Sequence, residues 1–111
     1  MQTDQRLRKT HDFANVRAGG KSWNNQHLVL QTKPNDRLRS RFGFSVSKRI
    51  GNSVKRNRLK RQLREAAKLA QVNEGYDIVF IAKINARYAN YTQLSDSLQR
   101  LCSRAGILSE V

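Results

Sequence analysis

The segment NSVKRNRLKRQLREAAKLA, residues 52–70, has the periodicity of one amphipathic helix, and the rest of the chain must be arranged around it. At about 100° per residue, one arc of this helix is apolar and holds Leu59, Leu63, Ala66, Ala67 and Ala70. Asn52 and Ser53 are both suitable N-cap residues. The pattern predicts that the apolar arc packs on a sheet and leaves the opposite arc free for solvent or a partner.

The opposite arc of this helix is basic. We place on it Arg58, Lys60, Arg61, Arg64 and Lys68. From Lys48 to Arg64 the chain has eight cations and no acid, whereas a solvated helix face normally mixes charges of both signs. Cations near a helix N-terminus cost roughly 0.3–1 kcal/mol each. Several phosphate contacts that release counterions can outweigh this cost, so the pattern favours binding to a polyanion.

The whole chain of 111 residues is basic, with 22 Lys and Arg against 8 Asp and Glu and a net charge of +14. Self-repulsion on this scale destabilises a compact protein, so the charge predicts a polyanionic partner, with nucleic acid first and an anionic membrane second. The length suits one domain with a modest core. We assign residues 1–111 to that domain, with residues 1–9 as a loose basic arm.

Targeting signals and cysteine usage indicate the compartment. No apolar run approaches the ~20 residues that a membrane helix needs, and residues 1–13 lack the apolar run of a signal peptide. The single cysteine, Cys102, cannot form an internal disulfide. We therefore expect a cytoplasmic protein with no membrane partner.

The remaining segments predict helices and strands in a mixed order. Residues 10–20 read as a short helix with Thr10 as N-cap, and residues 92–105 as a closing helix. The expected strands cover 27–33, 40–47 and 76–84, and a further small strand is expected within 22–40. This order predicts an α+β fold, a single-domain sandwich with one sheet packed with helices.

Candidate catalytic residues are scattered along the chain and form no recognisable constellation. His11, His27 and Cys102 lie far apart and lack the spacing of zinc ligands. Asn57, between two arginines, could read a base edge or orient a hydrated metal, or could be a solvated helix residue. Phe13 could stack on a base or belong to the core, and composition favours the core.

The kind of nucleic acid follows from what surrounds the basic helix. A DNA-reading helix-turn-helix fits poorly, because the segment before residue 53 reads as strand and loop rather than as a companion helix. Structured RNA fits better, since recognition of shape and phosphates uses broad basic surfaces.

The segment FGFSVSKRIGNSVKRNRLKRQLREA (42–66) closely resembles the signature of the protein subunit of bacterial ribonuclease P, including its Arg-Asn-Arg motif at 56–58. Weaker similarity covers RLRKTHDF (6–13), HLVLQT (27–32) and YDIVFIAK (76–83). The resemblance implies one mixed sheet with a left-handed β-α-β crossover through the helix at 53–70. It also implies a partner, a large catalytic RNA that holds the catalytic Mg²⁺ and removes the 5′ leader from precursor transfer RNA, with no small-molecule substrate.

The resemblance assigns roles to individual residues. Leader binding is implied for Phe13, which reverses the compositional interpretation. It is also implied for Arg17, which stands where the family commonly has an aromatic, and for Gln31, which stands where a tyrosine can occur. With these two departures, leader contact is expected to use less stacking and more charge and hydrogen bonding. Asn57 is implied to lie near bound metal. The RNA-binding set comprises Ser47, Lys48, Arg49, Lys55, Arg56, Asn57, Arg58, Lys60, Arg61, Arg64 and Lys68. The alternatives are a structural ribosomal RNA-binding protein and, third, a nuclease that acts without RNA.

Overall fold

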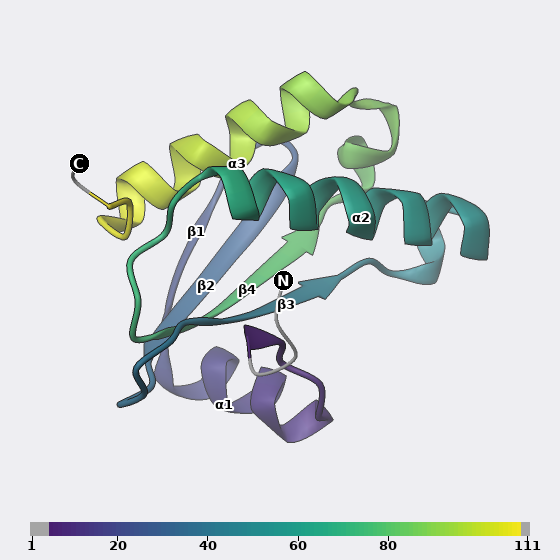
Figure 1. Cartoon of the computed structure of the whole chain (residues 1–111). Helices are drawn as coiled ribbons and strands as arrows, with labels where there is room; N and C mark the ends of the chain where they lie inside the picture. The colour runs from purple at the N-terminus through teal and green to yellow at the C-terminus, as the bar shows by residue number, and fades with distance from the viewer. Residues whose placement is uncertain (1–4, 110–111) are drawn as a thin grey trace.

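A sheet lies between two layers of helices, with α1 on one face and α2 and α3 side by side on the other (Figure 1). The computed structural model describes residues 5–109. The helices are α1 (Thr10–Gly19), α2 (Ser53–Leu69) and α3 (Tyr91–Ala105), with short 3-10 helices η2 (Lys48–Ile50) and η3 (Ile84–Tyr88). The strands are β1 (Lys21–Asn24), β2 (Leu28–Pro34), β3 (Arg41–Ser45) and β4 (Tyr76–Ala82).

The sheet is mixed and has four strands in the order β1-β2-β4-β3. β2 pairs antiparallel with β1 and β4, whereas β3 runs parallel to β4. In this register, Phe80 of β4 lies between Leu30 of β2 and Phe44 of β3. The predicted α+β sandwich is therefore present, and β3, α2 and β4 form its β-α-β unit. The left-handed sense of that unit stays a prediction from the resemblance.

The core surrounds β4, which is covered on both faces. Ile78 and Phe80 pack with Leu63 of α2, while Val79 on the other face packs with Val16 of α1. Each of these five side chains is at most 2% exposed. Burial on both faces explains why this strand is almost continuously apolar in sequence.

Helix ends follow the capping residues. Asn52 caps α2, and its Oδ1 accepts a hydrogen bond from the Lys55 backbone N–H at 2.9 Å. Asn90 caps α3 by accepting from the Gln93 N–H at 2.8 Å, so this helix begins at Tyr91, one residue before the expected start. These asparagines satisfy backbone donors that have no partner inside the helix.

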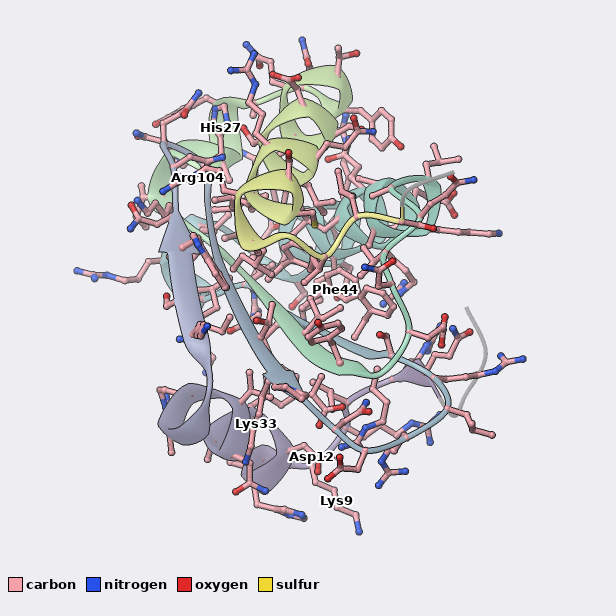
Figure 2. All side chains as sticks on the ribbon, turned by 90° about the vertical axis from the view of Figure 1, so that its left-hand side faces the viewer. Lys9, Asp12, His27, Lys33, Phe44 and Arg104 are labelled. Carbon is pink, nitrogen blue, oxygen red and sulfur yellow. The ribbon has the colours of Figure 1, made fainter. Side chains whose placement is uncertain are left out.

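The expected N-cap of α1 is wrong by one residue. Lys9 is the N-cap and has extended backbone, while Thr10 is already helical. The Lys9 N–H donates to Asp12 Oδ2 at 3.4 Å, and the two residues lie together at the start of the helix (Figure 2). The carboxylate of Asp12, in the first turn, therefore caps the N-terminus of α1 in place of a Ser or Thr side chain at the N-cap position.

The strands differ slightly from their expected bounds. β3 stops at Ser45, opposite Ile81, and η2 begins three residues later at Lys48. β4 stops at Ala82 because η3 begins at Ile84. β1, at 21–24, corresponds to the small strand expected within 22–40 and begins one residue earlier.

The expectation of a loose arm over residues 1–9 is wrong for its second half; residues 1–4 lie outside the described part. Leu7 is only 6% exposed and packs with Val16 and Val79. Its backbone N–H donates to the Phe42 carbonyl at 2.8 Å, beside an isolated bridge between Arg6 and Phe42. An apolar residue between basic neighbours thus fixes this segment to the free edge of β3.

An ion pair locks β3 beside β4. Arg41 donates through Nε to Asp77 Oδ1 at 2.8 Å and through Nη2 to Oδ2 at 2.6 Å, and Asn35 Nδ2 donates to Oδ1 at 3.0 Å. Burial by itself would raise the pKa of Asp77, but the hydrogen bonds from Arg41 and Asn35 outweigh it and leave the pKa lowered. The carboxylate is thus held charged, and the bidentate geometry defines the strand pairing.

Candidate RNA-binding surface

Helix α2 lies with its apolar arc on the core, as predicted. Leu59, Leu63, Ala66 and Ala67 are buried, and Ala70 just beyond the helix packs against them. The basic residues are not confined to the opposite arc. Lys55, Arg58, Arg61 and Lys68 are exposed, as is the neutral Asn57 of the predicted set, whereas Arg56, Lys60 and Arg64 are half-buried.

The two flanks of α2 face different neighbours, and this corrects the expected single basic face. Lys60 and Arg64 turn toward β3 and line a groove with it. Arg58 turns toward η3 and α3 instead and lines a pocket with them. A helical wheel cannot show this division, because it records angles about one axis and not the neighbours on each side.

The groove between α2 and β3 has a volume of about 270 Å³ and combines aromatic and basic side chains. We call it the α2–β3 groove, and it is lined by Arg6, Leu7, Arg8, Phe13, Phe42, Gly43, Phe44, Lys60 and Arg64. Sequence reasoning missed Arg6, Arg8 and Phe44 in this role. The alternation of basic and apolar residues at 6–8 was the signal that could have indicated an edge segment.

Phe44 connects the groove to the core. Its ring stacks on Phe80, with centroids 6.0 Å apart and an interplanar angle of 15°, and the guanidinium of Arg64 lies 5.8 Å from its centroid. Stacked rings and a cation–π contact orient both side chains before any partner arrives. Phe44 is half-buried, and it both packs against the core and lines the groove.

Two arginines on this part of α2 hold donors without acceptors. The Nε atoms of Arg56 and Arg64 are buried and find no hydrogen-bond partner within residues 5–109. Arg56 also donates through Nη2 to Ser53 Oγ at 3.3 Å. Buried donors are normally satisfied, because an unmet one costs about 1–3 kcal/mol. An acceptor such as a phosphate oxygen would supply the missing bond.

Phe13 lies where the core meets the α2–β3 groove, and the stacking of a base on its ring stays a prediction. It is half-buried and packs with Leu7, Val16 and Val79, yet it also lines the α2–β3 groove. Its ring lies over Gly43 so closely that a Cβ there would be 2.6 Å from two ring carbons. The glycine is therefore the position that lets the ring reach the groove wall.

The other two residues expected at the leader site lie outside the lining of the groove. Arg17 is exposed on α1, one turn after Phe13. Gln31 is half-buried on β2 and pairs in register with Val79, which packs beneath Phe13. Both are close in topology to Phe13, but their part in leader binding stays a prediction.

The loop before α2 adds positive charge at the start of the helix. Ser47, Lys48 and Arg49 are exposed, and the last two lie in η2, which buried Ile50 anchors to the core. These residues therefore continue the exposed cations of the first turns of α2.

The metal expectation rests on Asn57 alone. Among residues 5–109, no group of three or more His, Cys, Asp or Glu side chains is arranged to hold a metal ion. Asn57 is exposed, and the residues one turn further along α2 are Lys60 and Arg61. An amide oxygen among cations offers a metal at most one ligand, which is far short of the oxygen set that Mg²⁺ prefers.

None of the helices formed by residues 5–109 is long and apolar enough to cross a membrane.

Comparison with known proteins gives a consistent result along the whole chain. The family model described as Ribonuclease P matches residues 1–106. The chain is 42% identical over 107 residues to the ribonuclease P protein component of Herpetosiphon aurantiacus, covering 95% of this chain and 87% of that one. It is 41% identical over 111 residues to that of Roseiflexus castenholzii, covering 97% and 91%.

Solved structures with the same fold carry the same description. The ribonuclease P protein of Staphylococcus aureus superposes with a TM-score of 0.87 at 32% identity, covering 95% of this chain and 98% of that one. That of Thermotoga maritima superposes with a TM-score of 0.81 at 30% identity, covering 89% and 96%.

Proposed function

The chain belongs to the ribonuclease P protein family, and from this premise we propose that it binds the catalytic RNA of that enzyme together with the 5′ leader of precursor transfer RNA. As a protein component of ribonuclease P, it is part of a ribonucleoprotein nuclease of transfer RNA processing. The finer assignment of which surface binds which RNA is our proposal. A cytoplasmic location is proposed with it, since the substrate is a newly made transcript.

The observation that carries the leader proposal is the α2–β3 groove. Phe13 and Phe44 offer ring faces, while Arg64 and Lys60 line the same groove. A single-stranded leader supplies bases that stack and phosphates that need neutralising, and such strands are bound by this combination of side chains. The buried Nε of Arg64, which has no acceptor within the described residues, is a donor for a leader phosphate.

The exposed cations of α2 and η2 are proposed to hold the catalytic RNA. Lys48, Arg49, Arg61 and Lys68 are exposed. Arginine forks suit phosphate pairs, and each neutralised phosphate releases counterions. Glu65 is the single acid of α2, and its one negative charge does not neutralise these cations.

Magnesium is proposed to be held mainly by the RNA. Residues 5–109 offer no carboxylate cluster for it, and Asn57 supplies one neutral oxygen. With an ion held by the RNA nearby, the Asn57 amide would help to orient the hydrated ion. When bound, Mg²⁺ supplies a water nucleophile and charge neutralisation at the scissile phosphate; the protein side chains position the leader beside that centre.

Reconstitution with the catalytic RNA at low magnesium tests the proposal. The protein should increase the rate of leader removal, and Arg64→Ala should weaken binding of leader-bearing precursor roughly tenfold, as expected for one charge-assisted hydrogen bond. Arg39→Ala is the matched control, because Arg39 is exposed in the β2–β3 turn, at the opposite end of β3 from η2.

Three results would contradict the proposed function. If the protein does not increase leader removal and ribosomal RNA co-purifies with it, the result favours the alternative that the chain is a structural ribosomal RNA-binding protein. If the protein cleaves precursor after all RNA has been removed, the nuclease resides in the protein itself. Equal effects of Arg64→Ala and Arg39→Ala would mean that the groove is not the leader site.

A further inference from the structure

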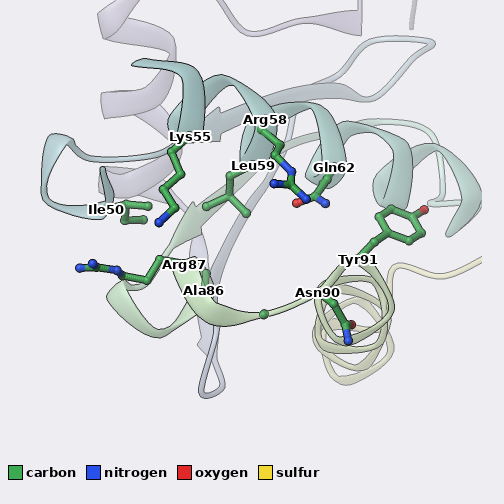
Figure 3. A pocket seen from close by; sticks show the side chains of 10 residues that line it. Ile50, Lys55, Arg58, Leu59, Gln62, Ala86, Arg87, Asn90 and Tyr91 are labelled. Carbon is green, nitrogen blue, oxygen red and sulfur yellow. The ribbon is translucent and has the colours of Figure 1, made fainter. Parts of the chain in front are cut away.

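A second basic pocket lies on the other flank of α2, between that helix, η3 and the start of α3 (Figure 3). We call it the α2–α3 pocket. Its volume is about 330 Å³, and it is lined by Ile50, Lys55, Arg58, Leu59, Gln62, Ala86, Arg87, Ala89, Asn90 and Tyr91. It shares no lining residue with the α2–β3 groove. A strand bound in that groove would have to cross α2 to reach it.

Three cations line this pocket without an acid to balance them. Lys55 and Arg58 come from α2, and Arg87 comes from η3. Lys55 extends from α2 toward η3, which carries Arg87 (Figure 3). The lining contains no Asp or Glu, and no ion pair joins these three to a carboxylate within residues 5–109. Like charges gathered around one hollow repel each other unless an anion lies between them.

The floor of the pocket is apolar, which points to more than a phosphate. Ile50, Leu59 and Ala86 are each at most 5% exposed and form a hydrophobic base. Around it stand Gln62, with a side-chain amide, and Tyr91, with an amphipathic ring. An apolar floor with a few polar groups at the rim is the usual form of a site for a small planar ligand, and the volume is at the low end of the roughly 300–1,000 Å³ of such sites.

We propose that the α2–α3 pocket receives one unpaired nucleotide of the catalytic RNA, with its base on the apolar floor and its phosphates at Lys55, Arg58 and Arg87. Sequence-specific recognition of RNA uses bases that are splayed out of the helix, stacked on side chains and bound at their edges. Arg87 is thereby assigned as an RNA-contacting residue outside the basic helix. The inference rests on the proposed partnership with the catalytic RNA.

The leader is the less suitable occupant. It is already accommodated by the aromatic side chains of the α2–β3 groove, and the α2–α3 pocket faces away from that groove across the helix. A large folded RNA can contact both flanks of α2 at once. The guanidinium of Arg87 also lies 4.9 Å from the centroid of the Tyr88 ring. Tyr88 is 75% exposed, so its ring offers a face beside the pocket on which a neighbouring base can stack.

Binding of Arg87→Ala to the catalytic RNA is the first test. The dissociation constant should rise roughly tenfold, and the slope of its logarithm against log salt should fall by about 0.7–0.9. Arg39→Ala removes the same charge from the exposed β2–β3 turn and should change binding less than about twofold. In both variants the ratio of the affinity for precursor to the affinity for mature transfer RNA should stay unchanged. Thermal unfolding of each variant checks that it is folded.

Crosslinking identifies the occupant. Gln62→Cys places a reactive thiol in the pocket, and the native Cys102 is fully buried and remains unlabelled. A short photo-crosslinker at position 62 should react with one unpaired nucleotide of the catalytic RNA, and Arg87→Ala should reduce the yield. A crosslink to the leader, a crosslink only to paired regions, or no RNA crosslink would overturn the proposal.

Two failures can be told apart. If the unmodified protein stimulates leader removal while Arg87→Ala and Arg39→Ala bind the catalytic RNA equally, the pocket assignment fails and the proposed function stands. If the unmodified protein does not stimulate the catalytic RNA, the proposed function fails, and the pocket assignment fails with it.

Discussion

Gly43→Ala is the sharpest test of how Phe13 reaches the leader. A Cβ at position 43 would lie 2.6 Å from two carbons of the Phe13 ring, whereas ordinary contact begins at 3.4 Å. The ring must therefore withdraw by about 0.8 Å or rotate, and the new methyl group also occupies the α2–β3 groove. Both effects should weaken stacking of a base on Phe13.

The magnitude follows from what stacking contributes. A base stacked on an aromatic side chain contributes about 1–3 kcal/mol, so Gly43→Ala should raise the dissociation constant for leader-bearing precursor by roughly 5- to 150-fold at most. Overpacking costs about 1–3 kcal/mol of folding stability, partly offset because glycine in a strand is itself less stable than alanine by about 0.5–1 kcal/mol. The net loss is then about 0–2.5 kcal/mol, which should still leave a folded protein.

The assay is equilibrium binding of reconstituted enzyme to precursor and to mature transfer RNA. Mature transfer RNA has no leader, so its affinity should not change. Gly19→Ala is the control, because a Cβ there meets only the flexible end of Lys33, at 3.1 Å. Equal weakening of both RNAs would show that Gly43 acts through stability alone.

A double-mutant cycle with Phe13→Ala completes the test. If the clash with the ring is the cause, Gly43→Ala should have little further effect on leader affinity once the ring is gone, since the two changes act through one contact. Fully additive losses would refute the reasoning, because Gly43 would then act on the leader independently of Phe13.

Three further outcomes are expected. Asp77→Asn should lower the free energy of unfolding at pH 7 by about 3 kcal/mol. The pKa of Asp77 is lower in the folded protein than its ordinary value of 3.8. The charged carboxylate therefore stabilises the fold above pH 3.8, and this stabilisation is lost as the pH falls through the folded-state pKa. Denaturant unfolding at pH 7 and pH 3 should therefore show the difference shrinking in acid, and a constant difference would contradict the role of its charge. Combined Arg58→Ala and Arg61→Ala should reduce the salt slope of RNA binding by roughly one to two units with little change in melting temperature; strong unfolding at an unchanged slope would mean that they are structural. Burial raises the pKa of the Cys102 thiol to about 12, so an alkylating reagent at pH 8 should modify it only as fast as the protein unfolds, and rapid modification would show that the α3 core is open.

The elements that follow from local pattern were predictable. The amphipathic spacing of 52–70 predicted α2 with Asn52 or Ser53 as its cap, and the apolar run at 76–84 predicted a strand; the structure selects Asn52 and shows that the strand is covered on both faces. Periodicity contains this information because neighbouring residues report the environment of a single element. The same segment, through its resemblance to a known family, indicated the partner class.

Single residues at the ends of elements were less predictable. Thr10 was expected as the N-cap of α1, but Lys9 takes that position, because Asp12 accepts its N–H. Leu7 was expected in a loose arm, but it is buried, because the edge of β3 and the Val16–Val79 cluster lie nearby in space. Such outcomes depend on partners far along the chain, which a local pattern does not contain.

The sequence by itself determined that this protein has a basic amphipathic helix on an α+β core, and its net charge predicted a polyanionic partner. Only the tertiary structure decided how that charge is divided, with Lys60 and Arg64 beside the aromatic rings next to β3 and Arg58 beside Arg87 next to α3. The physical reason is that a helix has two flanks, and each flank gains its chemistry from whichever distant segment packs against it. The identity of that segment is set by strand order and chain crossover, which arise only when the whole core assembles.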